Sequence, residues 1–239
     1  MNIERYGPDS GIPCLWVHGW LGDGSEGKVL QDILGDTFQL ICPDLPGHGQ
    51  TPLEDWTFPK VLQELALLAH DCEAAMGYSM GGRFLMMAAA KAPLSFQQLV
   101  IESSHPGLQS EKERIARKQV DAQRSDELME KGLCDFCDQW YSAPMWAGFT
   151  PPERKGDSEQ LAGALRRFGL SHQPDLRPWL RTTRNRLLWL AGSKDQPYVD
   201  HARWVRSNTT HQVEWIDAGH NVHGQCSEQW AESVRHFLV

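Results

Sequence analysis

A serine flanked by glycines is the clearest chemical signal in this sequence. Positions 77–81 read Gly-Tyr-Ser-Met-Gly, which has the form Gly-x-Ser-x-Gly. Small residues flank the serine in this pattern because the strand-to-helix turn that presents it is tight and a larger side chain would clash. The pattern also occurs in ordinary turns, but here it lies between a strand-like run at 74–77 and an alanine-rich helical stretch that ends near Ala92. We therefore predict that Ser79 is a catalytic serine at the end of a strand.

A serine of this kind needs a histidine and an acid that orients the histidine. Both are expected later in the chain, each in a loop that follows a strand. Asp195 follows the apolar run 187–191, and His220 follows the run 213–216. The order and the placement predict a catalytic triad of Ser79, Asp195 and His220.

Three other residues compete for these roles. Asp200 and Asp217 are alternative acids, and His223 is an alternative base. Each is explained more simply as a residue at a helix terminus or in a solvated loop. Asp195 and His220 are therefore the preferred pair.

Two backbone donors are expected to hold a negatively charged oxygen near the serine. In this arrangement they are the N–H group after the nucleophile and one N–H group from a loop after an early strand. Met80 supplies the first donor, and Trp20, after the apolar run 12–18, supplies the second. His18 precedes the glycine of this loop, and we expect it to orient the backbone there. The turn-rich loop at 44–49 is expected to be structural.

A fixed positive charge lies close to the predicted nucleophile. Arg83 stands four residues after Ser79, one helical turn on, so both side chains share a helix face. An arginine at this place suits a substrate carboxylate, which a guanidinium can bind with two parallel hydrogen bonds. The alternative is that Arg83 pairs with an acidic residue of a neighbouring helix.

The elements that must position these residues alternate between strand-like and helix-like runs. Such alternation favours a mostly parallel sheet. The strand-like runs are 12–18, 38–43, 74–77, 98–102, 187–191 and 213–216, and the helix-like runs between and after them include 60–71, 198–207 and 228–238.

A long middle segment lacks the strand signal. Charged helices are expected there at 111–124, 126–140 and 158–168. We predict that residues 105–181 form a helical cap inserted into an α/β core, whose two parts are residues 1–104 and 182–239.

The composition narrows the class of protein. The chain has 239 residues, 41% of them hydrophobic, and a net charge of −8, which favours one α/β domain with an insertion and gives no broad attraction to nucleic acid or anionic lipid. No run approaches the ~20 apolar residues that cross a bilayer, and the first residues lack an apolar signal segment. We expect a soluble, cytoplasmic enzyme that acts on a small molecule, with no membrane insertion and no obligate protein partner. No nucleotide-binding or metal-binding motif is present, so no cofactor is expected.

The six cysteines are scattered through strand-like and helix-like segments. Without a secretory signal we interpret them as reduced thiols. Cys134 and Cys137 form a single Cys-x-x-Cys pattern with no second pair of metal ligands beside it. Two cysteines on a packed helix are the simpler explanation.

Five stretches taken together resemble one family. They are Gly-Tyr-Ser-Met-Gly-Gly-Arg at 77–83, Glu-Ser-Ser-His-Pro-Gly-Leu at 102–108, Trp-Tyr at 140–141, Gln-Pro-Asp-Leu-Arg at 173–177 and Ala-Gly-His-Asn-Val-His at 218–223. In order and spacing they are similar to the 2-succinyl-6-hydroxy-2,4-cyclohexadiene-1-carboxylate synthase family. The Gly-x-Ser-x-Gly pattern and the triad are shared with the whole α/β-hydrolase superfamily, whereas the other segments are typical of a much smaller group of proteins.

This resemblance covers nearly the whole chain and implies both a fold and an activity. The implied fold is the α/β-hydrolase fold, a mostly parallel central sheet with helices on both faces and an inserted helical cap. The implied activity is a lyase of menaquinone (vitamin K2) biosynthesis, in which the triad promotes proton abstraction from a cyclohexene intermediate and elimination of pyruvate. The implied substrate carries three carboxylates.

The resemblance also implies substrate-binding residues. Arg83 matches the family position on the nucleophile helix, and Arg117 matches the position in the cap. The third arginine falls where this chain differs in length, so Arg154 is expected there, with Lys155 and Arg166 as alternatives. The remaining substrate-binding residues implied are Tyr78, Trp140 and Tyr141.

Two other functions stay open. A carboxylesterase or thioesterase would use Ser79 as a covalent nucleophile, and a catalytically inactive binding protein could share the fold. Arg83 together with Arg117 favours the lyase, because a hydrolase for neutral acyl groups needs neither charge.

Overall fold

The computed structural model describes residues 1–146 and 148–239. Over these residues the chain forms a seven-stranded sheet in the order β1-β3-β2-β4-β5-β6-β7. Neighbouring strands run parallel except β1, which pairs antiparallel with β3. The strands are β1 (Ile3–Tyr6), β2 (Ile12–Val17), β3 (Phe38–Pro43), β4 (Ala74–Tyr78), β5 (Gln98–Glu102), β6 (Arg186–Gly192) and β7 (Gln212–Ile216).

The central parallel strands are buried on both faces because side chains alternate between two apolar layers. In β2, Leu15 and Val17 face one layer, whereas Cys14 and Trp16 face the other. The same alternation runs through β4, β5 and β6. Because neither face of these strands meets water, their sequences are near-continuous apolar runs, and such runs predicted them correctly.

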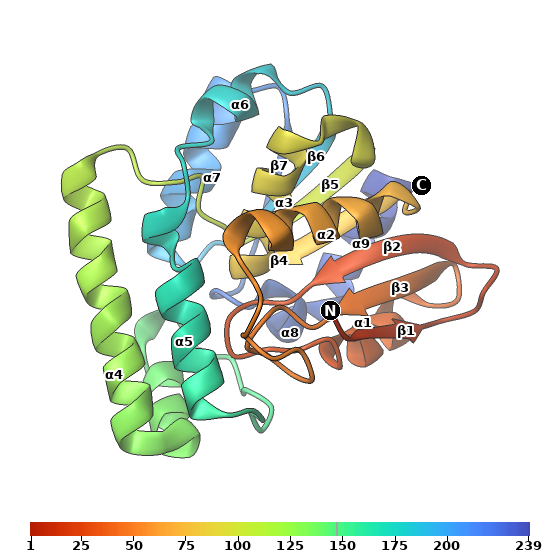
Figure 1. The fold of residues 1–239 in the computed structure, drawn as a ribbon. Helices are drawn as coiled ribbons and strands as arrows, with labels where there is room; N and C mark the ends of the chain where they lie inside the picture. The colour runs from red at the N-terminus through yellow and green to blue at the C-terminus, as the bar shows by residue number, and fades with distance from the viewer. Residues whose placement is uncertain (147) are drawn as a thin grey trace.

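Helices cover each face of the sheet. Figure 1 shows α2 in front of the strands and α9 behind them. One apolar layer is completed by α2 (Phe58–His70), α3 (Met80–Lys91), α6 (Arg177–Thr182) and α7 (Gln196–Asn208), and the other by α1 (Glu26–Leu34), α8 (Val222–Gln225) and α9 (Ser227–Leu238). This arrangement confirms the predicted fold class.

Two helices between β5 and β6 pack on each other at one side of the molecule. They are α4 (Glu111–Tyr141) and α5 (Ser158–Phe168), which lie side by side in green and teal in Figure 1. Short 3-10 turns, η2 (Pro144–Trp146) and η3 (Leu170–His172), follow them, and a third, η1 (Pro93–Ser95), precedes β5.

The predicted boundary between two helices at residues 124–126 is wrong. The helix continues through Ser125, whose hydroxyl donates to the carbonyl of Asp121 within the helix and to the carbonyl of Ala162 on α5. The chain instead bends at Gly132, which has φ 76° and ψ 167° inside α4. Glycine adopts this positive φ without the steric cost that a Cβ imposes.

The other predicted elements are confirmed to within about two residues at each end, as expected for element boundaries. β1, α1, α6 and α8 were not predicted. β1 is a short edge strand in which charged residues interrupt the apolar pattern, so no strand signal arises. None of the helices that the structure describes is long and apolar enough to span a membrane.

Candidate active site

Ser79 occupies a strained turn between β4 and α3. Its φ is 51°, a region that non-glycine residues rarely adopt and that costs energy unless the surroundings impose it. Neighbouring glycines make the turn possible: a Cβ on Gly81 would lie 2.1 Å from the carbonyl oxygen of Val17, and one on Gly77 would lie 2.7 Å from the nitrogen of Gly82. The N–H of Ser79 donates to the carbonyl of Glu102 at 2.8 Å, which ties the elbow to β5.

Ser79, His220 and Asp195 come together after the carboxyl ends of β4, β7 and β6. Nε2 of His220 lies 3.0 Å from Oγ of Ser79, and Nδ1 of His220 lies 2.6 Å from Oδ2 of Asp195. The Asp195 residue is fully buried and His220 is 2% exposed. With the carboxylate on Nδ1–H, the free Nε2 lone pair faces the serine, which is the tautomer that a general base requires.

The competing acids and base lie elsewhere. Asp200 pairs with Arg203 at 2.9 Å, and Asp217 pairs with Lys194 at 3.0 Å, both on exposed surface. His223 is buried against Glu102. Asp200 and Asp217 therefore have the solvated roles that the sequence suggested, whereas His223 is buried and bonded to a carboxylate, which the sequence did not suggest.

Aromatic rings cover the histidine of the predicted triad. Trp146 of η2 stands perpendicular to His220 with ring centroids 5.0 Å apart, and the Tyr198 ring of α7 lies at 4.4 Å. The backbone N–H of His220 donates to the carbonyl of Met145 at 2.8 Å. These contacts leave the imidazole little freedom to rotate away from Ser79.

The two predicted oxyanion donors belong to residues that line the same cavity as Ser79. Met80 is the first residue of α3, and the first N–H groups of a helix have no partner within it. Trp20 follows Gly19, where a Cβ would lie 2.8 Å from the ring of Tyr78. Nε2 of His18 accepts a hydrogen bond from the backbone N–H of Leu45. Nδ1 of the same ring lies 2.7 Å from the carbonyl oxygen of Gly19. His18 therefore joins the loops that follow β2 and β3.

A cavity of about 320 Å³ opens above the triad. This volume suits a small substrate. Its lining comes from the core and from α4, α5 and η2; the predicted site residues that line it are Trp20, Tyr78, Ser79, Met80, Arg83, Arg117, Trp140 and His220.

Arg83 projects into this cavity from α3 and is 7% exposed. Its guanidinium donates to the carbonyl of Phe168 at 3.2 Å and to Oε1 of Gln173 at 3.3 Å. Among the residues that the structure describes it makes no ion pair. Burial, and the nearby charge of Arg117, lower the pKa of Arg83 to about 10, so the residue still carries its charge at neutral pH.

Comparison with known proteins agrees with this geometry. The Alpha/beta hydrolase family matches residues 14–233. The 2-succinyl-6-hydroxy-2,4-cyclohexadiene-1-carboxylate synthases of Salmonella heidelberg and Citrobacter koseri are each 32% identical over 252 aligned positions, which cover 100% of this chain and 98% of each relative. This chain belongs to the 2-succinyl-6-hydroxy-2,4-cyclohexadiene-1-carboxylate synthase family.

Solved structures support the same assignment. MenH from S. aureus superimposes with a TM-score of 0.90 at 25% identity, covering 99% of this chain and 97% of that one. A thermophilic esterase from Thermogutta terrifontis superimposes with a TM-score of 0.74 at 21% identity, covering 99% and 92%. The second likeness shows the α/β-hydrolase fold alone.

In this member of the synthase family, Arg154 lies outside the catalytic cavity. Its guanidinium pairs with Oε1 of Glu26 at 2.5 Å and donates to the hydroxyl of Tyr141 at 2.9 Å. Arg154 and Tyr141 instead line a separate hollow of about 610 Å³. Of the two alternatives, Lys155 lines another hollow beside α1, and Arg166 pairs with Asp126 on exposed surface. The structure therefore does not bring the predicted third cation to the triad.

The cavity contains residues that the sequence did not single out. They are Arg124, His105, Met145, Trp146, Leu165, Leu170, Pro197, Tyr198 and His201. Burial and neighbouring positive groups lower the pKa of His105 to about 2 and that of His201 to about 4, so both rings are neutral at neutral pH. Nδ1 of His105 accepts the N–H of Gly107 at 2.9 Å, which leaves its Nε2–H free to donate.

Glu102 was also missed, because its role depends on contacts distant in sequence. Its carboxylate accepts the N–H groups of Val222 at 2.8 Å and His223 at 3.2 Å, just after the catalytic histidine. Nδ1 of His223 lies 2.9 Å from the same oxygen. Burial by itself would lower the pKa of His223, but the Glu102 carboxylate raises it above its usual value. Glu102 and His223 thus form a buried pair beside the loop that carries His220, and the carboxylate favours the protonated form of His223.

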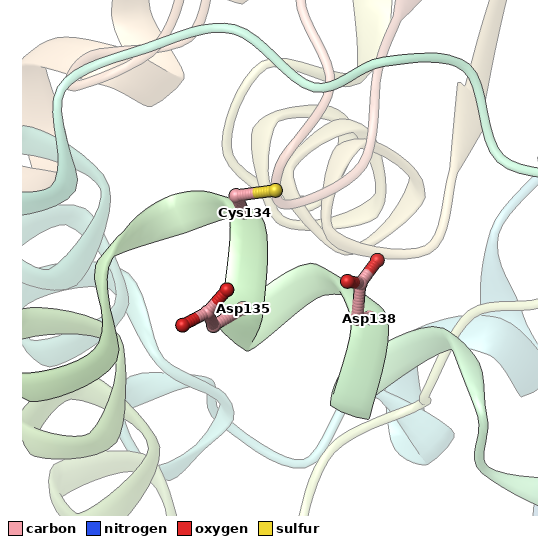
Figure 2. Close-up of side chains that lie close together, drawn as sticks. All are labelled: Cys134, Asp135 and Asp138. Carbon is pink, nitrogen blue, oxygen red and sulfur yellow. The ribbon is translucent and has the colours of Figure 1, made fainter.

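Two further features lie away from the triad. A larger cavity of about 780 Å³ between α2, α3 and residues 167–176 contains none of the triad residues. Beyond the bend in α4, ligand atoms of Cys134, Asp135 and Asp138 lie within 4.8 Å of one another (Figure 2). All three side chains are exposed, and a group of exposed acidic residues is common without a metal, so we assign no site there.

Proposed function

We propose that this chain is a carbon–oxygen lyase of menaquinone biosynthesis. It would convert 2-succinyl-5-enolpyruvyl-6-hydroxy-3-cyclohexene-1-carboxylate into 2-succinyl-6-hydroxy-2,4-cyclohexadiene-1-carboxylate and pyruvate. The names of its relatives support the product. The observation that carries the proposal is Arg83, a buried cation without an ion-pair partner among the described residues, in the same cavity as Ser79.

The two compound names define the bonds that change. The hydrogen on ring carbon 2, next to the succinyl ketone, is removed, and the double bond at carbon 3 is replaced by double bonds at carbons 2 and 4. The electrons that move expel the oxygen on carbon 5, and the enolpyruvate released takes up a proton to become pyruvate. No oxidant or water is consumed.

The triad supplies the base for this elimination. Ser79 takes the ring proton and passes its own hydroxyl proton to Nε2 of His220, over the 3.0 Å contact between them. Asp195, 2.6 Å from Nδ1, stabilises the imidazolium that results. The proton on His220 then returns to the leaving enolpyruvate, which closes the cycle.

Removal of the proton places negative charge on the ketone oxygen of the succinyl group. We assign the N–H groups of Met80 and Trp20 to this oxygen, and the N-terminus of α3 adds its positive dipole. Arg83 and Arg117 hold substrate carboxylates, and Tyr78 and Trp140 shape the apolar wall. These donors and charges are supplied by the chain itself.

Ester or thioester hydrolysis remains the second candidate, since the same triad geometry suits a covalent serine nucleophile. Two assays on the purified protein separate them: pyruvate release from the cyclohexene intermediate, and p-nitrophenol release from p-nitrophenyl acetate. We expect rapid pyruvate release and slow ester cleavage, with both lost in Ser79→Ala. Rapid ester cleavage without pyruvate release would refute the lyase assignment.

We also propose a cytoplasmic location. All six cysteines, each within the described residues, are free thiols, and three of them are buried in the core. Free thiols persist in a reducing compartment. Fractionation of the source cells with an antibody to this chain would test the location.

A further inference from the structure

A buried carboxylate on α4 lies between two arginines that face the catalytic cavity. Arg117, Asp121 and Arg124 are spaced by four and three residues, so they share one face of the helix. Oδ1 of Asp121 lies 2.8 Å from Nε of Arg117 and 3.7 Å from the nearest guanidinium nitrogen of Arg124. Asp121 itself is 3% exposed.

The Arg124 guanidinium is held from a second side as well. Its central carbon lies 4.9 Å from the ring centroid of Trp140, a distance at which a cation is attracted by the ring face. Trp140 in turn packs edge-on against Trp20, with centroids 5.5 Å apart. Arg124 is therefore fixed at the cavity wall, next to a loop that carries a proposed oxyanion donor.

Positive charge is in excess at this cavity. The described residues that line it include Arg83, Arg117 and Arg124 but no aspartate or glutamate, and Asp121 behind the lining carries one negative charge against the two arginines that it contacts. Burial and the nearby Arg117 lower the pKa of Arg124, as they do for Arg83. Partly desolvated cations that repel one another are stabilised when an anion binds between them.

We propose that Arg124 is a carboxylate-binding residue of the catalytic cavity and acts there together with Arg83 and Arg117. The inference rests on the proposed function, because it gives each of the three substrate carboxylates one guanidinium. Arg154, predicted from sequence for the third contact, already pairs with Glu26 and Tyr141 and does not line this cavity.

The test compares Arg124→Gln with Arg166→Gln. Both remove one cap arginine, but Arg166 pairs with Asp126 on exposed surface. For each variant we would measure kcat and KM for pyruvate release, melting temperature, and the Kd of 2-succinylbenzoate, a stable aromatic dicarboxylate with the succinyl and ring carboxylates of the product.

We assign Arg124 to one of the two carboxylates that 2-succinylbenzoate shares with the substrate. We therefore expect Arg124→Gln to raise both KM and the Kd of 2-succinylbenzoate by about tenfold to a hundredfold, since a hydrogen bond to a charged group is lost. Its melting temperature should stay close to that of wild type, because the change also relieves repulsion with Arg117. Arg166→Gln should leave KM and Kd as in wild type. Equal KM and Kd values for the two variants would overturn the inference.

A third variant tests the competing residue. Arg154→Gln should lower the melting temperature, because Glu26 loses its buried partner, with little change in the Kd of 2-succinylbenzoate. If Arg154→Gln weakens binding and Arg124→Gln does not, Arg154 makes the third contact and the inference is wrong.

Failure of the proposed function looks different. If wild type binds 2-succinylbenzoate and depends on Arg124 for it, yet releases no pyruvate, the lyase assignment fails and the carboxylate site stands. If wild type does not bind 2-succinylbenzoate, the cavity is not a site for such carboxylates and Arg124 has no role of this kind.

Discussion

Glu102 and His223 form a buried pair next to the predicted triad, with Nδ1 of His223 2.9 Å from Oε1 of Glu102. The backbone carbonyl of the same glutamate accepts the N–H of Ser79 at 2.8 Å. Glu102 thus contacts the nucleophile through its main chain and the loop after His220 through its side chain. We therefore expect this residue at the end of β5 to hold the serine and the histidine at their observed separation.

We expect Glu102→Gln to lower kcat with little change in KM, since the amide keeps the shape but loses the charge that holds the His220 loop. Removing one partner of a buried pair costs about 3 kcal/mol of unfolding free energy. The pKa of His223 is higher in the folded chain than in the unfolded chain. The pair therefore contributes to the free energy of unfolding below the unfolded pKa, and this contribution disappears as pH rises through the folded pKa. Denaturant unfolding should therefore show a larger loss at pH 6 than at pH 9.

Glu232→Gln is the matched control for that experiment, because Glu232 is exposed on α9. It should leave kcat and unfolding free energy unchanged at both pH values. A Glu102→Gln variant with wild-type kcat would show that the pair does not position the triad.

Ser79→Ala, His220→Ala and Asp195→Asn should each reduce turnover by several orders of magnitude while the fold is retained. Their effects should not add, because the three side chains act as one proton-transfer unit. Pyruvate release measured for single and double variants, with circular dichroism as a check on folding, tests this. Ser207→Ala, an exposed change on α7, is the control; near-normal turnover in Ser79→Ala would remove the triad from the mechanism.

Arg83→Lys should lower kcat/KM by one to two orders of magnitude. Lysine keeps the charge but loses the planar pair of donors, and a hydrogen bond to a charged group contributes about 1.5–3 kcal/mol. Arg186→Lys is a matched control, because Arg186 donates to the carbonyl of Phe237 at 2.9 Å far from the cavity. A change in melting temperature with unchanged kcat/KM in Arg83→Lys would mean that Arg83 is structural.

His48 should make the protein less stable in acid. Burial and the nearby His18 lower its pKa from 6.5 to about 3, so between these values the unfolded chain binds a proton that the folded chain does not. Stability therefore falls as pH drops below 6.5. From pH 7 to pH 5 this one residue should account for about 2 kcal/mol of lost unfolding free energy.

His48→Gln should remove that share of the pH dependence. Denaturant unfolding of wild type and variant at pH 7 and pH 5 gives the difference directly. His236→Gln, at an exposed position on α9, should retain the wild-type fall. An equal fall in His48→Gln would show that His48 is not the residue responsible.

The sequence by itself determined the class of fold and predicted the three residues of the triad. Strands that are buried on both faces have continuous apolar sequences, which can be recognised without the structure. The Gly-x-Ser-x-Gly pattern can be recognised too, because the geometry of its turn depends on a few adjacent residues. The acid and the histidine could be placed because the carboxyl ends of parallel strands meet at one edge of the sheet. The family motifs then indicated which of the reactions found in this superfamily to expect.

Only the tertiary structure decided which charged side chains share the cavity. Arg124 and Arg154 are both cap arginines, and nothing in the local sequence shows that one lies beside Trp140 whereas the other is neutralised by Glu26, 128 residues away. Glu102 lies near the end of an ordinary strand, and its partner His223 is 121 residues further on. Such pairings depend on how helices pack and on where a chain bends, here at Gly132, and packing joins residues that local patterns do not relate.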